Sequence, residues 1–316
     1  MTPPVEAAGR HVVAFEAIGT RWSVTTGAPL DAALLGAVHR TIDDYDRVFS
    51  RFRPDSTVMA ASRAPGTFSL PAETAAPLLA LYDRLAALTD GAVSPLVGAS
   101  LEHLGYDAGY GLRPLPGYLP APRWDEVCDW DGERLTTRAP VVIDVGALGK
   151  GQLVDLVAAV LEQAGVTWFT VDAGGDLRHR GAAPALRVGL EHPARADGRT
   201  VVGVVEVADG AVCGSAPNRR TWGDGIHHVL DARTGAPTRG VAATWGVARS
   251  AMLADAAATA LFFVPPERLG ALDAGAGSPT DGVVPPGAGV TGVVLGDDGR
   301  ARWSPGLPGE MFSEAS

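Results

Sequence analysis

The fold of this chain is decided by residues 141–181, which read VVIDVGALGKGQLVDLVAAVLEQAGVTWFTVDAGGDLRHRG. The first five, Val141 to Val145, are apolar and β-branched apart from Asp144, as in a buried strand. An apolar helical period follows, and a helix is expected to begin near Lys150. A second apolar run, Val166 to Val171, predicts another strand. The stretch therefore predicts a strand-turn-helix-strand unit.

The turn of this unit has the features of an anion site. Gly146, Gly149 and Gly151 surround Lys150. Glycines let the backbone come close to a ligand, and a helix N-terminus offers unpaired N–H groups to an anion. The spacing matches neither the P-loop nor the GxGxxG dinucleotide pattern. The residues alone leave two interpretations open, a phosphate site and a tight turn with a solvated lysine.

Composition narrows the class of protein. The chain has 316 residues and a mass of 32.5 kDa, enough for one large domain or two joined ones. A formal charge of −10 argues against nucleic acid as a partner. The two cysteines, Cys128 and Cys213, form no disulfide framework and no metal-binding spacing. Residues 1–21 carry charges where a secretory signal would be apolar, so we expect a cytoplasmic protein without a membrane anchor.

Periodicity and turn signals predict the remaining elements. Helices are expected from an N-cap at Asp31, over Ala72 to Thr89 and over Leu253 to Val264. Strands are expected over Arg10 to Thr26 with a break at Gly19, Ala185 to Leu190, Thr200 to Val207, Ile226 to Leu230 and Ala242 to Ala248, with a hairpin from Gly289 to Ser304. Irregular structure is expected over Phe49 to Ser62, Asp90 to Arg123 and Pro265 to Gly287.

This irregular alternation favours an α+β fold over a purely parallel sheet. We expect one domain over residues 10–304, or two closely joined lobes, with flexible termini at 1–9 and 305–316.

Polar residues gather at other strand ends. Gly174 and Gly175 stand between Asp172 and Asp176, where they predict either a turn with exposed backbone or an ordinary strand end. Adjacent histidines, His227 and His228, should point to opposite faces of their strand.

One histidine of the pair is a candidate base with an ordinary pKa near 6.5, or the pair is a surface histidine beside a buried one. The polar segment Cys213 to Ser215 is expected to be a turn or a plain loop. On the last helix, Asp255 and Thr259 lie one turn apart, and their oxygens suit Mg²⁺, although this spacing is also common by chance.

Taken together and in order, these clusters resemble the ApbE family of FAD:protein FMN transferases. The resemblance spans about residues 14–264. The matching segments are Ile18 to Thr20, Phe49 to Phe52 with Asp55-Ser56, Gly91 to Gly98, Asp144 to Asp155, the Gly-Gly-Asp turn, His228 to Gly235 and Ala254 to Thr259.

The resemblance implies a transferase with mixed, largely antiparallel sheets packed with helices, in an ApbE-like, T-fold-related architecture. Such an enzyme moves the FMN half of FAD to a threonine hydroxyl of an acceptor flavoprotein and releases AMP. Mg²⁺ would be held by the side chains of Asp255 and Thr259 and by the carbonyl of Ala147. The candidate catalytic residues are His228 as general base, Lys150 and Asp231. The candidate FAD-contacting residues are Ile18, Phe52, Ala92, Val93, Ser94, Asp144, Lys150, Gly174, Gly175, Leu230 and Thr234.

Two alternatives stay open from the sequence. With water in place of threonine, the same site would act as an FAD pyrophosphatase that makes FMN and AMP. The second alternative is that the chain is a non-catalytic FAD-binding protein. Two departures from the family pattern bear on them, since Ser94 stands where an Asp is usual and Ala258 where many members have Ser or Asp. Acceptors in this family carry a short Asp-x-x-x-Thr-like segment.

Overall fold

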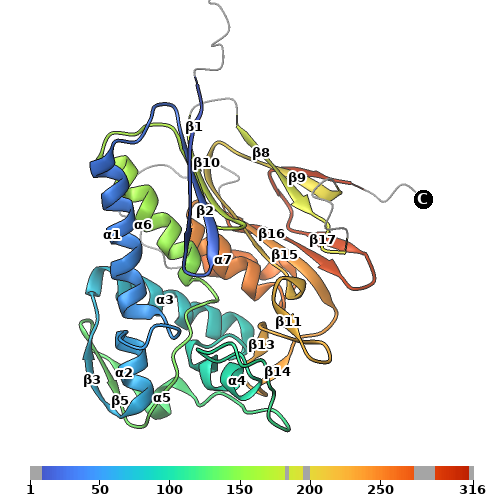
Figure 1. Ribbon diagram of the computed structural model, residues 1–316. Helices are drawn as coiled ribbons and strands as arrows, with labels where there is room; N and C mark the ends of the chain where they lie inside the picture. The colour runs from blue at the N-terminus through green and yellow to red at the C-terminus, as the bar shows by residue number, and fades with distance from the viewer. Residues whose placement is uncertain (1–8, 182–184, 195–199, 274–288, 313–316) are drawn as a thin grey trace, which may run out of the picture.

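A computed structural model describes residues 9–181, 185–194, 200–273 and 289–312. Its centre is an eight-stranded sheet in the order β1-β2-β6-β7-β10-β15-β16-β17, and all its strand pairs are antiparallel (Figure 1). Its strands are β1 (His11–Ala17), β2 (Thr20–Thr26), β6 (Phe169–Asp172), β7 (Asp176–Arg180), β10 (Asp209–Ser215), β15 (Val241–Ala248), β16 (Thr291–Gly296) and β17 (Ala301–Trp303).

The two faces of this sheet are covered differently. The helices α6 (Gly149–Gln163) and α7 (Ala251–Ala260) pack on one face. α1 (Ala32–Phe49) lies against α6, and α3 (Ala72–Thr89) lies against α7 (Figure 1). A second, three-stranded sheet adjoins the other face; it contains β8 (Leu186–Glu191), β9 (Val201–Val207) and β18 (Gly309–Met311).

Side-chain alternation along β10 shows how one strand serves both layers. Ala211 and Cys213 belong to the large apolar cluster on the helix side. Val212 belongs to a second cluster, with Leu190 and Val205 of the smaller sheet. Successive side chains of a strand point to opposite faces, so a strand this deep in the sheet is apolar on both.

Short elements complete the chain. A small sheet is formed by β3 (Gly66–Ser69), β4 (Cys128–Trp130) and β5 (Arg134–Thr137), and two-residue ladders by β11 (Thr221–Trp222) with β12 (Ile226–His227) and β13 (Leu230–Asp231) with β14 (Ala236–Pro237). The short helices are α2 (Thr57–Arg63), η1 (Pro95–Val97), α4 (Gly98–His103), α5 (Trp124–Val127), η2 (Pro217–Arg220) and η3 (Pro266–Leu272).

Many sequence predictions are confirmed, beginning with the α+β class and its antiparallel sheets. Asp31 is the N-cap of α1, and its side chain accepts the N–H of Leu34 at 2.7 Å. The helix predicted over Ala72 to Thr89 has those same bounds, and α6 begins at Gly149. The expected C-terminal hairpin is the pair β16 and β17.

The first strand of the central unit was predicted wrongly. Residues 141–145 are in no strand, although Val141 and Ile143 are buried. Their backbone bonds go to scattered partners, since the N–H of Val141 donates to the carbonyl of Ala61 and that of Asp144 to the carbonyl of Pro95. The segment is an irregular linker that packs Val141 and Ile143 into the core, and their burial explains the apolar pattern.

Other boundaries also differ from the predictions. The segment expected to be irregular after Phe49 contains α2, because the Ser56 side chain caps the N–H of Met59. The predicted strand Ile226 to Leu230 is two separate short strands, β12 and β13. The strand predicted from Arg10 to Thr26 is a hairpin that turns at Gly19.

The polar segment at Cys213 is part of β10 and not a turn. Part of the C-terminal segment predicted to be flexible forms β18, which pairs with β9. The predictions for residues 1–8, 274–287 and 313–316 lie outside the described residues. In the described ranges, no helix has the length and apolarity that a bilayer span requires.

Candidate active site

A cavity of about 800 Å³ opens where the sheet, α6 and α7 meet the loops below them. Nearly all of the predicted site residues line it. These are Ile18, Phe52, Ala92, Val93, Ser94, Asp144, Ala147, Lys150, Gly174, Gly175, His228, Leu230, Asp255 and Thr259. They come from segments far apart in the sequence, so the fold assembles the site that the motifs predicted separately.

Lys150 forms an ion pair inside this cavity. Its Nζ lies 2.6 Å from Oδ2 of Asp176, whose side chain is 1% exposed, while the lysine keeps 27% exposure. Burial acts to lower the pKa of Lys150, but the carboxylates of Asp176 and Asp255 raise it above its ordinary value. Lys150 is therefore a fixed cation at neutral pH, with one side open to the cavity.

Asp255, Thr259 and Ala147 present oxygens to the same cavity. The hydroxyl of Thr259 donates to the carbonyl of Ala147 at 2.9 Å, and Asp255 precedes Thr259 by one helical turn on α7. Burial, and secondly the Asp176 carboxylate, raise the pKa of Asp255 well above its usual range. A cation beside this carboxylate would relieve that cost, so the oxygen set fits a hard divalent ion.

The protein supplies only part of a coordination shell there. In the described ranges, no three His, Cys, Asp or Glu side chains gather into a metal-binding group. A cation held by Asp255, Thr259 and Ala147 would need further oxygens from a bound ligand and from water.

Gly151 has a different role from the one predicted. A Cβ at this position would lie 2.2 Å from the carbonyl oxygen of Ala251 and 2.8 Å from the Cβ of Asp255. The missing side chain thus allows α6 and α7 to cross closely. The N–H of Gly151 donates to Oδ2 of Asp255 at 2.9 Å, so this helix-end donor holds a side chain of the site.

The two histidines have different surroundings, although β12 ends at His227 and His228 lies outside any strand. His227 is buried, and its Nε2 lies 2.9 Å from the carbonyl of Thr238. His228 lines the cavity, and its Nδ1 is buried without a hydrogen-bond partner. Burial and the nearby Arg220 lower the pKa of His228 to about 4, not the 6.5 expected from the sequence. His228 is therefore neutral at pH 7.

The sequence did not single out Arg51, which joins two walls of the cavity. Its Nε donates to Oδ2 of Asp144 at 2.5 Å, and its Nη1 donates to the carbonyl of Tyr106 at 2.7 Å. Burial acts to raise the pKa of Asp144, but Arg51 and the N–H of Gly146 hold it below its usual range. The predicted FAD contact Asp144 therefore also has a structural part, because it fixes the loop before α6 to the end of α1.

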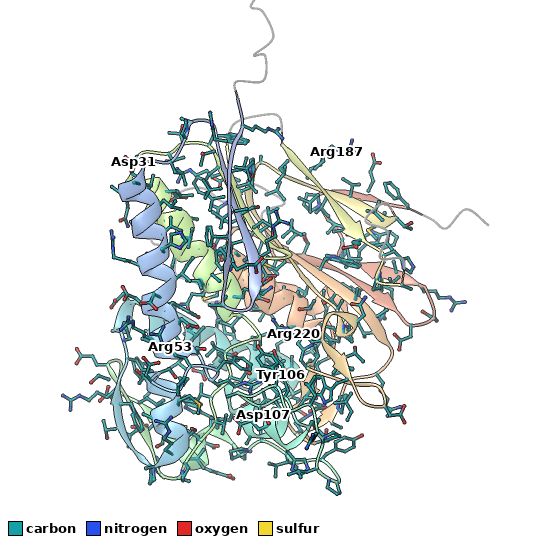
Figure 2. The ribbon with its side chains drawn as sticks, in the orientation of Figure 1. Asp31, Arg53, Tyr106, Asp107, Arg187 and Arg220 are labelled. Carbon is teal, nitrogen blue, oxygen red and sulfur yellow. The ribbon has the colours of Figure 1, made fainter. Side chains whose placement is uncertain are left out.

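Aromatic rings surround this guanidinium. Arg51 lies over the rings of Phe52 and Tyr106, at 4.3 and 4.8 Å from their centroids. The Nη1 of Arg220 donates to the Tyr106 hydroxyl at 2.9 Å, and the two side chains lie beside each other in Figure 2. Tyr110 stacks on Phe52 with ring centroids 5.3 Å apart. This wall offers flat apolar surface next to a positive charge, which suits a planar heterocycle.

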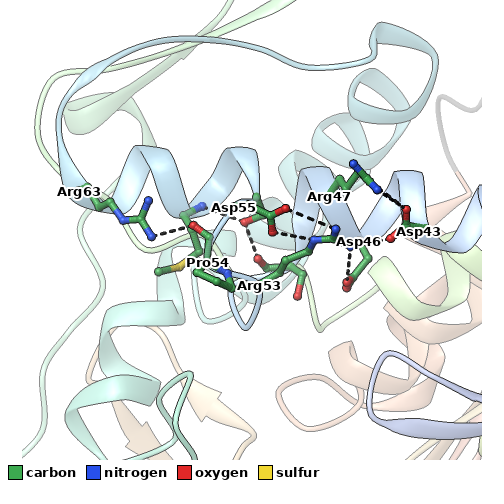
Figure 3. A network of polar contacts seen from close by, with 10 residues as sticks. Asp43, Asp46, Arg47, Arg53, Pro54, Asp55 and Arg63 are labelled. Carbon is green, nitrogen blue, oxygen red and sulfur yellow. Dashed lines mark hydrogen bonds and ion pairs between the residues drawn. The ribbon is translucent and has the colours of Figure 1, made fainter.

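An ion-pair network fixes the turn that carries Arg51 and Phe52. Arg53 pairs with Asp43 at 2.6 Å, Asp55 at 2.7 Å and Asp46 at 3.5 Å (Figure 3). The network joins the last turns of α1 to the segment before α2. Each exposed pair contributes little alone, but together they restrict the turn that faces the cavity.

The β1–β2 turn carries backbone strain at the cavity. Ile18 has φ 45°, which is unusual for a β-branched residue, and Gly19 follows with φ 72°. Both positive angles fit the two-residue hairpin turn that joins these strands. Strain of this kind often accompanies a functional position, and Ile18 lines the cavity.

Two predicted site residues are not brought to the cavity. Asp231 is the last residue of β13 and Thr234 lies in the turn that follows, and neither is among the described residues that line it. The Asp231 carboxylate is instead paired with Arg233 at 2.7 Å. Ala258 also does not line the cavity, because it packs toward β15, where the Thr244 hydroxyl donates to its carbonyl at 2.7 Å. A Ser or Asp side chain at position 258 would therefore not add an oxygen ligand to this cavity.

Fold and cavity together define an α+β protein that places a fixed lysine and a buried carboxylate around one large ligand site. The profile of the ApbE family matches residues 18–276, and the chain belongs to the ApbE family. An FAD:protein FMN transferase from Klebsiella pneumoniae is 26% identical over 288 residues, which cover 84% of this chain and 82% of that protein. One from Vibrio cholerae is 28% identical over 247 residues, 73% of each chain.

Solved structures show the same fold. The ApbE protein of Thermotoga maritima superposes with a TM-score of 0.75 over 94% of this chain and 97% of its own, at 24% identity. The flavin transferase ApbE of Vibrio cholerae has a TM-score of 0.72 over 95% and 98%, at 22% identity. At these identities, the structural likeness establishes the architecture.

Proposed function

We propose that this protein is an FAD:protein FMN transferase, an enzyme that moves the FMN moiety of FAD to a threonine hydroxyl of an acceptor flavoprotein and releases AMP. The observation that carries the proposal is the joint placement of Lys150, Asp255 and Thr259 on one cavity. Family membership supports the reaction class, and the curated relatives carry this activity in their names.

Phosphoryl transfer requires mainly that the protein positions the reactants and stabilises charge. Different residues of the cavity have these two roles. Lys150 stabilises negative charge on the diphosphate of FAD, and Asp176 keeps the lysine protonated and in place. Asp255, Thr259 and the carbonyl of Ala147 would hold Mg²⁺. When bound, Mg²⁺ neutralises diphosphate oxygens and improves AMP as a leaving group.

His228 is the proposed base. Its neutral imidazole accepts the proton of the threonine hydroxyl as that oxygen bonds to the FMN phosphorus and the bond to the AMP oxygen breaks. A pKa of about 4 makes His228 a weak base in the empty cavity. The negative charges of a bound diphosphate would raise that pKa toward the useful range.

Mass spectrometry and AMP release test the proposal together. The protein is incubated with FAD, Mg²⁺ and a flavoprotein from the same genome that has an Asp-x-x-x-Thr-like segment. We expect the acceptor to gain the mass of FMN, with one AMP released for each acceptor modified and no transfer in EDTA. Equal AMP release with and without acceptor would identify an FAD pyrophosphatase, and tight FAD binding without AMP would identify a binding protein. Location of the protein in the cytoplasm stays a prediction from the sequence, and cell fractionation tests it.

A further inference from the structure

Two carboxylates join α6 and α7, and each accepts hydrogen bonds from the N-terminus of the other helix. Asp255 of α7 accepts the N–H of Gly151, in the first turn of α6, at 2.9 Å. Asp155 of α6 accepts the N–H of Ala251 at Oδ1, 2.8 Å, and that of Met252 at Oδ2, 2.9 Å. The first N–H groups of a helix have no partner within it, so each helix completes the end of the other.

Asp155 has no substitute in this arrangement. The N-cap of α7 is Ser250, whose hydroxyl accepts only the N–H of Leu253, at 3.4 Å. The amides of Ala251 and Met252 therefore depend on Asp155. Burial raises the pKa of Asp155 to about 6, so the group is ionised at pH 7 and both oxygens accept. An acceptor pair that holds two successive amides fixes the helix end in direction as well as in distance.

Two other contacts lie near this end of α7. At Gly151 the backbones come into close apposition, which sets their separation. The Sγ of Cys213 donates to the carbonyl of Ala251 at 3.3 Å, a weak bond from the sheet below. The two bonds of Asp155 are short and charge-assisted, and they lie one helical turn before Asp255.

We infer that Asp155 is a positioning residue for the cation site: it fixes α7 along α6, so that Asp255 and Thr259 line the cavity together with Lys150 and Ala147. The inference rests on the proposed function for the identity of the ion. Asp155 itself is absent from the described residues that line the cavity. Its effect passes through α7, whose short, rigid span carries both side-chain oxygens.

Binding of Mn²⁺ tests the inference without relying on turnover. Electron paramagnetic resonance gives the Mn²⁺ dissociation constant of the full chain with FAD present. Asp155→Asn keeps the shape of the side chain but offers one acceptor oxygen, and its NH₂ opposes the second amide. We expect this variant to bind Mn²⁺ about 10–100-fold more weakly, as for other groups that orient metal ligands. The half-saturating Mg²⁺ for AMP formation should rise equally, with KM for FAD unchanged at saturating Mg²⁺.

Ser250→Ala is the matched control, because it removes a cap from the same helix end without cutting the link to α6. It should lower the unfolding temperature and leave the Mn²⁺ dissociation constant unchanged. If Asp155→Asn does not fold, Asp155→Glu takes its place, since it keeps the charge but moves the oxygens outward and should also weaken Mn²⁺ binding.

Unchanged Mn²⁺ affinity in the folded variant, with a wild type that binds the ion, overturns the inference. Failure of the proposed function looks different, because the wild type would then bind Mn²⁺ yet make no AMP from FAD. A wild type that binds no Mn²⁺ overturns the cation site and this inference with it.

Discussion

Gly151→Ala tests whether the close crossing of α6 and α7 sets the site. The added Cβ would lie 2.2 Å from the carbonyl oxygen of Ala251, against an ordinary contact of about 3.4 Å, so α7 must move by roughly 1 Å. Overpacking of this kind costs about 1–3 kcal/mol, and the better helix propensity of alanine returns up to ~1 kcal/mol. We expect a net loss of roughly 0–2 kcal/mol in unfolding free energy.

The effect on activity should be larger than the effect on stability. A displacement of about 1 Å at a reacting group costs on the order of 10²-fold in rate, and the shift also moves Asp255 away from the Gly151 N–H. Urea unfolding and AMP release measure the two effects. Gly36→Ala in α1 is the control, because the added Cβ would contact only the flexible end of the Arg40 side chain. This variant should be more stable than the wild type and fully active. Full transfer activity in a well-folded Gly151→Ala protein would refute the reasoning.

Three further predictions concern the charges of the cavity. Lys150→Met leaves Asp176 buried without its cation and should destabilise the protein by roughly 1–3 kcal/mol, less than a fully buried pair because the lysine is 27% exposed. Adding Asp176→Asn should restore stability in urea but not transfer, and restored activity would show that Lys150 is dispensable. His228→Gln should lower transfer by about 10²-fold or more with FAD binding intact, and normal turnover would remove it from the mechanism. Because folding lowers the pKa of His228 from 6.5 to about 4, unfolded chains bind more protons in that window and stability rises with pH across it. Denaturation at a series of pH values should show a flatter rise in His228→Gln, and an identical slope would contradict the assigned pKa.

Local signals predicted local structure well. The Asp31 cap, the bounds of α3 and the start of α6 depend on neighbouring residues, and they are readable from the sequence. The different surroundings of His227 and His228 do not come from strand alternation, because β12 ends at His227 and His228 lies in the bend after it. Most of the site residues predicted from motif order line the cavity.

Long-range contacts account for what the sequence did not predict. The strand β10 contains two glycines and a cysteine, which give little strand signal, and it forms because β7 and β15 pair with it on both sides. Residues 141–145 have a strand pattern without a strand partner. The bond between Arg51 and Asp144 joins residues 93 positions apart, and that between Asp155 and Ala251 joins residues 96 apart. No periodicity marks such pairs.

Glycine at position 151 shows how one signal can have another cause. Its neighbours Lys150 and Gly149 favoured a ligand-binding turn, yet the space at Gly151 is filled by α7. Gly149 and Lys150 line the cavity, whereas the close packing of α6 and α7 is the reason for glycine at position 151.

The most direct test of the proposed cation site is a crystal structure of the protein with FAD and Mn²⁺, in which anomalous scattering locates the manganese. The account predicts one Mn²⁺ bound by Asp255, Thr259 and the carbonyl of Ala147, with a diphosphate oxygen paired to Nζ of Lys150. Manganese at another place, or a diphosphate that does not reach Lys150, would contradict it.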